Sequence, residues 1–222
     1  MPTLWTFGDS MTAGDGCVDN LPIRDGELKY YNEYKKEGDN IWPVFLANKL
    51  GFNLKNLGLS GASNDKIIDR FINNFFDIKT DDIVILSKTF DNRFDVPINN
   101  TNSKLTTIYA ESLATVKKDL EEFRYNNNKI EMETILNFGL IFMTNDLYEK
   151  RNDKRFDFFA KLLINNGNKV ILWDVDSPLK KSFESIYQGT NGEIKDGHFS
   201  FKGHRDLSDF FYYQLMNEKT LI

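Results

Sequence analysis

The sequence predicts a three-layer α/β/α (flavodoxin-like) fold with a central, mainly parallel sheet of four to five strands. Short apolar, β-prone runs alternate with longer segments of helical spacing along the 222 residues. One of these runs, residues 83–86, is apolar at every position, which suits a strand covered on both faces. Consecutive parallel strands need crossover connections, and helices commonly provide them. Because the chain shows no internal repeat and no linker, we expect residues 1–222 to form a single domain.

The N-terminal half contains three predicted strands and two predicted helices. Pro43 suits the first turn of a helix, and Gly51 is placed to end that helix. A second helix is indicated by apolar residues at helical spacing from Ile67 to Ile72. In chain order we expect a strand at residues 3–7, a helix at residues 42–50, a strand at residues 52–57, a helix around residues 67–72 and a strand at residues 82–86.

The C-terminal half is predicted to be mostly helical. Residues 103–124 and residues 129–148 both show apolar residues at helical spacing. We further expect a helix at residues 154–164, a fourth strand at residues 170–173 and a final helix at residues 207–216. This pattern does not determine the order of the strands in the sheet. Residues 14–38 are polar and lack a clear period, so we expect a long surface excursion there.

Composition excludes several classes of function. The net charge is -5, whereas non-specific nucleic-acid binding needs clustered Lys and Arg, so we expect no nucleic-acid partner. No apolar run approaches the roughly 20 residues of a membrane span, and residues 1–6 are too short for the apolar part of a signal peptide. Cys17 is the only cysteine, which excludes an intrachain disulfide and fits a cytoplasmic location.

The sequence also predicts that no metal or cofactor is needed. No group of His, Cys or carboxylate residues has metal-ligand spacing. The Gly-containing segments lack the P-loop lysine and the spacing of a dinucleotide-binding loop.

Ser10 is the first candidate catalytic residue. A serine hydrolase needs a hydroxyl at the end of a rigid element, an imidazole that takes its proton and a carboxylate that fixes the imidazole tautomer. Ser10 follows the first predicted strand, where chemistry is expected in open α/β sheets. The alternative interpretation is structural, since a serine in such a loop is commonly a helix cap. We expect the neighbouring Asp9 to hold this loop by hydrogen bonds rather than to react.

His198 is the candidate base, because the chain has two histidines and both lie near the C-terminus. Residues two apart in an extended segment point to the same side, so the Asp196 carboxylate can orient the imidazole of His198 toward Ser10. The alternative is a surface turn built on Asp196 and Gly197, with His198 in solvent. The second histidine, His204, is expected to cap or pack the final helix.

Three sequence blocks, in this order, resemble the SGNH (GDSL-like) family of serine hydrolases. They are FGDS at residues 7–10, NLGLSGAS at residues 56–63 and DGHFSFKGH at residues 196–204. The resemblance implies Ser10 as nucleophile, His198 as base and Asp196 as its orienting carboxylate. It also implies oxyanion-hole amides from Ser10 and Gly61, and no cofactor. The Asn-, Lys- and Phe-rich composition resembles phage-borne members, for which a virion-associated location is the alternative to the cytoplasm.

The third block departs from the family pattern. The family usually has G-x-N-D after the third strand, whereas this chain has LSKTFDNR at residues 86–93. Thr89 falls where the oxyanion-donating Asn would be, and its hydroxyl can donate in place of an amide; Asn92 is the alternative. Loss of an oxyanion donor costs on the order of 10²–10³ in turnover, which leaves room for a slow or inactive member. The spacing of Asp196 and His198 is shorter than in many members and resembles a variant form.

Two further sets of polar residues have open roles. Asp174 and Asp176 follow the fourth predicted strand and are the alternative orienting carboxylates. Arg93 has two interpretations, a site for a substrate carboxylate or phosphate and a loop salt bridge.

Together these residues predict hydrolysis of a small-molecule or carbohydrate ester through an acyl-Ser10 intermediate. Residues 15–38 are polar and rich in Tyr, whose rings can stack on sugars, which favours O-acetyl groups on a carbohydrate. One alternative is acyl transfer to a sugar hydroxyl. The other is a non-catalytic carbohydrate-binding or virion-associated module. The sequence leaves the oligomeric state open.

Overall fold

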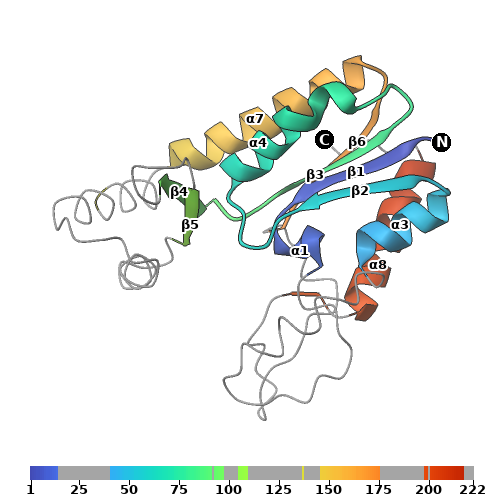
Figure 1. Ribbon diagram of the computed structural model, residues 1–222, viewed down its shortest axis with the longest axis horizontal. Helices are drawn as coiled ribbons and strands as arrows, with labels where there is room; N and C mark the ends of the chain where they lie inside the picture. The colour runs from blue at the N-terminus through green and yellow to red at the C-terminus, as the bar shows by residue number, and fades with distance from the viewer. Residues whose placement is uncertain are drawn as a thin grey trace, which may run out of the picture.

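The computed structural model describes residues 1–14, 41–91, 93–97, 105–109, 137, 146–175, 198–199 and 201–217. Within these ranges four strands form one sheet, in the order β2-β1-β3-β6 (Figure 1). They are β1 (Thr3–Gly8), β2 (Asn53–Gly58), β3 (Ile83–Lys88) and β6 (Lys169–Asp174). All three pairings are parallel, so the carboxyl ends of the strands meet at one edge of the sheet. The four predicted strands are confirmed, each shifted or extended by one or two residues.

Helices cover both faces of this sheet, which confirms the three-layer α/β/α fold (Figure 1). One face carries α3 (Trp42–Leu50) and α8 (Phe201–Met216), and the other carries α4 (Asn64–Asn74) and α7 (Asp146–Asn165). A four-residue helix, α1 (Ser10–Ala13), follows β1, and a 3-10 turn, η1 (Phe75–Asp77), follows α4. The helices predicted at residues 154–164 and 207–216 form the C-terminal parts of α7 and α8. No helix in the described ranges has the length and apolar character needed to cross a membrane.

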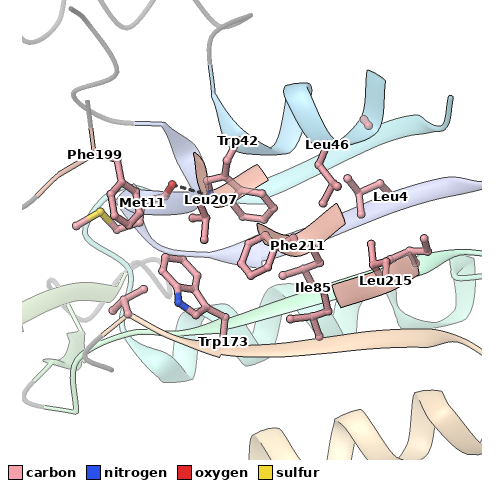
Figure 2. Close-up of a cluster of buried hydrophobic side chains, with 14 residues drawn as sticks. Leu4, Met11, Trp42, Leu46, Ile85, Trp173, Phe199, Leu207, Phe211 and Leu215 are labelled. Carbon is pink, nitrogen blue, oxygen red and sulfur yellow. Dashed lines mark hydrogen bonds between the residues drawn. The ribbon is translucent and has the colours of Figure 1, made fainter. Parts of the chain in front are cut away.

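Successive residues of β3 point into opposite layers. Ile83 and Ile85 join the buried cluster under α3 and α8, whereas Val84 and Leu86 join the cluster under α4 and α7. Figure 2 shows the first of these clusters, where the ring of Phe211 meets Trp42 and Trp173 edge to face. Burial on both faces is the reason why residues 83–86 are apolar at every position.

The helix predicted at residues 103–124 is wrong at its start, because residues 105–109 form the strand β5 (Leu105–Tyr109). This strand pairs antiparallel with β4 (Arg93–Pro97), an element that the sequence analysis did not predict. Leu105 and Ile108 fit helical spacing, but the segment also holds three β-branched residues, and the backbone bonds to β4 decide its structure.

Other sequence predictions lie largely outside the described residues. This applies to residues 110–124 of the same predicted helix and to the surface excursion at residues 15–38. Of the helix predicted at residues 129–148, position 137 is helical and the last three residues belong to α7.

His204 joins α8 to α3 inside the core. Its side chain is fully buried, and its Nδ1 accepts a hydrogen bond from the backbone N–H of Trp42 at 3.3 Å. Burial, aided by the nearby charge of His198, lowers the pKa of His204 to about 3. The expectation that His204 packs the final helix is therefore confirmed.

We expect acid to destabilise the protein through His204. The fold keeps this imidazole neutral, whereas the unfolded chain binds a proton near the ordinary pKa of about 6.5. The contribution of His204 to stability is therefore complete above about pH 6.5 and is lost as the pH falls toward 3, by up to about 1.4 kcal/mol per pH unit. Urea unfolding of the wild type and His204→Asn, from about pH 8 to about pH 4.5, checks this. The difference in their free energies of unfolding should shrink as the pH falls, and a constant difference would contradict the prediction.

Candidate active site

Ser10 begins α1, directly after β1 and at the carboxyl edge of the sheet. Asp9 caps this helix, because its Oδ1 accepts a hydrogen bond from the backbone N–H of Met11 at 3.0 Å. The expectation that Asp9 holds the loop by hydrogen bonds is confirmed. Since the cap is Asp9, the hydroxyl of Ser10 does not serve as the helix cap.

A glycine at the end of β2 lets α1 lie directly against the sheet. A Cβ on Gly58 would lie 2.4 Å from the backbone nitrogen of Ala13. Asn56 fastens the same helix, because its side-chain amide donates to the carbonyl of Thr12 at 2.9 Å. The position of Ser10 therefore depends on a close approach of two backbone segments that a larger residue than glycine would prevent.

The imidazole of His198 lies against the hydroxyl of Ser10. The distance from His198 Nε2 to Ser10 Oγ is 2.8 Å, across 188 residues of sequence. With its proton on Nδ1, the imidazole accepts the hydrogen bond of the serine O–H, which is the geometry of a base and its nucleophile. The structure thus brings two of the predicted catalytic residues together. The third, Asp196, lies outside the described residues.

Thr89 and Arg93 both bind the carboxylate of Asp9. The Thr89 hydroxyl donates to Asp9 Oδ2 at 2.6 Å, and Arg93 Nη1 donates to the same oxygen at 2.9 Å. Arg93 Nη1 also lies 2.8 Å from Thr89 Oγ1. A hydroxyl carries one proton, so the proton of Thr89 is directed at Asp9 in this arrangement. Of the two interpretations of Arg93, the structure shows the salt bridge.

The start of α4 holds the loop that contains Thr89. Asn64 is fully buried, and its Oδ1 accepts from the Thr89 N–H at 2.8 Å while its Nδ2 donates to the Thr89 carbonyl at 2.9 Å. Sequence reasoning missed this residue: a Ser before a helix indicates a cap, which Ser63 is, but nothing indicated a partner for Asn64.

Gly61, the predicted oxyanion-hole glycine, lies in the turn before α4. Its φ is 69°, a conformation that favours glycine.

Lys88 is a buried cation that the sequence analysis did not single out. Its ammonium lies 2.7 Å from Asp153, 2.9 Å from Asp91 and 3.4 Å from Asp174. Burial alone would lower the pKa of Lys88, but the three carboxylates outweigh it and hold that pKa well above its ordinary value. Asp174, an alternative orienting carboxylate, therefore faces Lys88.

Two other sequence candidates, Asp176 and Asn92, lie outside the described residues. In the part of the chain that the structure describes, no group of three or more His, Cys, Asp or Glu side chains could hold a metal ion.

Comparisons with known proteins give matches among solved structures alone. No protein-family model and no curated protein matches the chain. An aryl esterase from M. smegmatis is 15% identical with a TM-score of 0.40, covering 98% of this chain and 99% of that chain. A lipolytic protein of the G-D-S-L family from Veillonella parvula DSM 2008 is 15% identical with a TM-score of 0.39, covering 100% of both chains. A family two carbohydrate esterase from Clostridium thermocellum is 14% identical with a TM-score of 0.43, covering 98% of this chain and 64% of that chain.

The similar solved structures include G-D-S-L lipolytic proteins and esterases.

Replacing Gly58 by Ala should displace α1 and Ser10 with it, because the new methyl would meet the backbone of α1. Overpacking of this kind costs about 1–3 kcal/mol, and a displaced Ser10 should react roughly 10²-fold more slowly with a fluorophosphonate. Gly51→Ala is the matched control: its φ of 67° strains an alanine by about 1–2 kcal/mol, but its Cβ meets no atom within 4 Å. Urea unfolding should show a loss of stability in both variants, and mass spectrometry should show slower labelling of Ser10 in Gly58→Ala alone. Equal labelling rates would contradict the prediction.

Proposed function

We propose that this protein is a serine esterase of the SGNH type that hydrolyses short acyl esters through an acyl-Ser10 intermediate. The observation that carries the proposal is the 2.8 Å contact between His198 Nε2 and Ser10 Oγ. It pairs a hydroxyl with a base at the carboxyl edge of a parallel sheet, where such sheets bind their ligands. The two residues also come from the sequence blocks that resemble this family.

In the proposed reaction, Ser10 Oγ attacks the carbonyl carbon of the ester while His198 Nε2 takes its proton. The carbonyl oxygen becomes negative in the tetrahedral intermediate, and the backbone N–H groups of Ser10 and Gly61 stabilise it. The bond to the alcohol then breaks, and the leaving oxygen receives the proton from His198. Water then attacks the acyl carbon while His198 takes one of its protons. The bond to Ser10 Oγ breaks, which releases the carboxylic acid, and His198 returns the proton to Ser10.

Asp196 and Thr89 complete the proposed site. Asp196 would accept a hydrogen bond from Nδ1 of His198 and so keep Nε2 available as the base. Thr89 would be the third oxyanion donor. Because its proton is directed at Asp9, the hydroxyl would have to turn away from that carboxylate to reach the oxyanion.

The side chains next to the two reacting groups support a short acyl chain, such as acetyl. Met11 follows Ser10 and Phe199 follows His198, and both belong to the same buried cluster (Figure 2). For the alcohol part of the ester we propose a carbohydrate, a choice supported by the Tyr residues in the sequence at 15–38.

We expect the wild type to hydrolyse p-nitrophenyl acetate and Ser10→Ala to lose on the order of 10⁴-fold or more in kcat, because the nucleophile is gone. Mass spectrometry of the fluorophosphonate-treated wild type should place the adduct on Ser10. A folded wild type with neither turnover nor adduct would sink the esterase proposal and favour a non-catalytic carbohydrate-binding module. Product analysis with an added sugar acceptor separates hydrolysis from acyl transfer.

Asp196→Asn should lower kcat by about 10²–10⁴-fold, because an amide in place of the carboxylate no longer fixes the imidazole tautomer. Asp174→Asn is the matched control, since this carboxylate faces Lys88 and should leave kcat near the wild-type value. Steady-state kinetics of the two variants with p-nitrophenyl acetate provide the measurement. A large loss in Asp174→Asn with wild-type activity in Asp196→Asn would contradict the prediction and show that Asp174 orients the imidazole.

A further inference from the structure

Asp9 and Arg93 form a buried ion pair beside the nucleophile. The side chain of Asp9 is fully buried, and Arg93 is 8% exposed. Arg93 Nη1 lies 2.9 Å from Asp9 Oδ2 and also donates to the carbonyl of Ala62 at 3.2 Å. The Thr89 hydroxyl donates to the same carboxylate oxygen at 2.6 Å. The ion pair therefore joins the loop before α1, the turn before α4 and the start of β4.

The charge of Asp9 matters because this residue directly precedes Ser10. In the proposed reaction, negative charge develops on the substrate oxygen that the Ser10 amide binds. An uncompensated carboxylate on the preceding residue, Asp9, would oppose that charge. A guanidinium remains protonated at any pH that the protein meets, so it neutralises the carboxylate by direct contact.

We propose that Arg93 is a positioning residue of the reaction, which cancels the charge of Asp9 on the oxyanion side of the site. This inference rests on the proposed esterase function.

The other ionisable side chains near this ion pair have contacts of their own. Among the described residues, Arg93 is the cation in contact with Asp9. The neighbouring contacts are those of Lys66 with Asp95 at 3.4 Å, Lys88 with Asp91 at 2.9 Å, and His198 with Ser10 at 2.8 Å. Neutralisation of Asp9 is therefore assigned to Arg93.

Arg93→Met removes the cation and keeps an unbranched side chain. The carboxylate of Asp9 then lacks its compensating charge on the oxyanion side of the site. In Arg93→Met we expect kcat to lie roughly 10²-fold below the wild-type value, with KM little changed.

Two variants and one control identify the charge as the cause. The double variant Asp9→Asn, Arg93→Met removes both charges, so it should recover roughly ten-fold or more of the lost kcat. Arg93→Lys keeps the positive charge and should keep kcat near the wild-type value. Arg151→Met removes an exposed arginine that pairs with Asp65 on the outer layer, and it should change neither kcat nor KM.

Unfolding provides a readout that needs no turnover. In Arg93→Met the folded state buries the carboxylate of Asp9 without its cation, which is costly. The free energy of unfolding of Arg93→Met should therefore be lower than that of the double variant, which has no carboxylate at this position. Urea unfolding of the two variants at about pH 7 measures the difference.

A wild-type kcat in Arg93→Met, with a stability equal to that of the double variant, would overturn the inference. So would a loss of kcat that is not recovered in the double variant, because Arg93 would then act by packing. If Arg93→Met does not fold, a folded and active double variant supports charge compensation and an unfolded one overturns it. A folded wild type without labelling at Ser10 would instead contradict the proposed esterase function. The unfolding comparison of Arg93→Met with the double variant would still show whether Arg93 compensates the charge of Asp9.

Discussion

Asp9 lies at the carboxyl edge of the parallel sheet, and three segments donate hydrogen bonds to its buried carboxylate. They are the backbone of α1, the residue after β3 and the first residue of β4. A carboxylate removed from water is costly unless it is paired and hydrogen-bonded, so these segments are constrained to meet at one point. Ser10 takes its place from this constraint, and the C-terminal segment then brings His198 to its hydroxyl.

The strand order explains why distant sequence blocks converge on this point. β1 lies between β2 and β3, so the residues that follow these three parallel strands are neighbours at the same edge. Gly58 at the end of β2 admits α1, and the Thr12 hydroxyl of α1 donates to Ser87 Oγ of β3 at 3.2 Å. Lys88, the last residue of the same strand, is a buried cation that anchors α7 through Asp153.

Local sequence signals predicted the elements whose structure depends on burial periodicity and end residues. The helix at residues 42–50 has its predicted bounds, because Pro43 starts it and Gly51 ends it with a φ of 67°. The same reasoning was wrong at residues 105–109, where the apolar spacing also fits a helix and pairing with β4 decides the structure. Within the site, Ser10 and His198 could be predicted from their motifs. The ion pair of Arg93 with Asp9 could be named only as one of two alternatives, and Asn64 gave no signal.

The sequence by itself determined the alternation of strands and helices, the apolar faces of the sheet and the identity of the serine and histidine that meet. These depend on residue type and on short-range spacing, both of which are present in the linear chain. Tertiary structure decided the strand order, the β4–β5 pairing and the partners of Asp9, Lys88 and Asn64. A buried polar group takes whichever donor or acceptor the folded backbone brings within about 3 Å, and that choice depends on contacts between residues far apart in sequence.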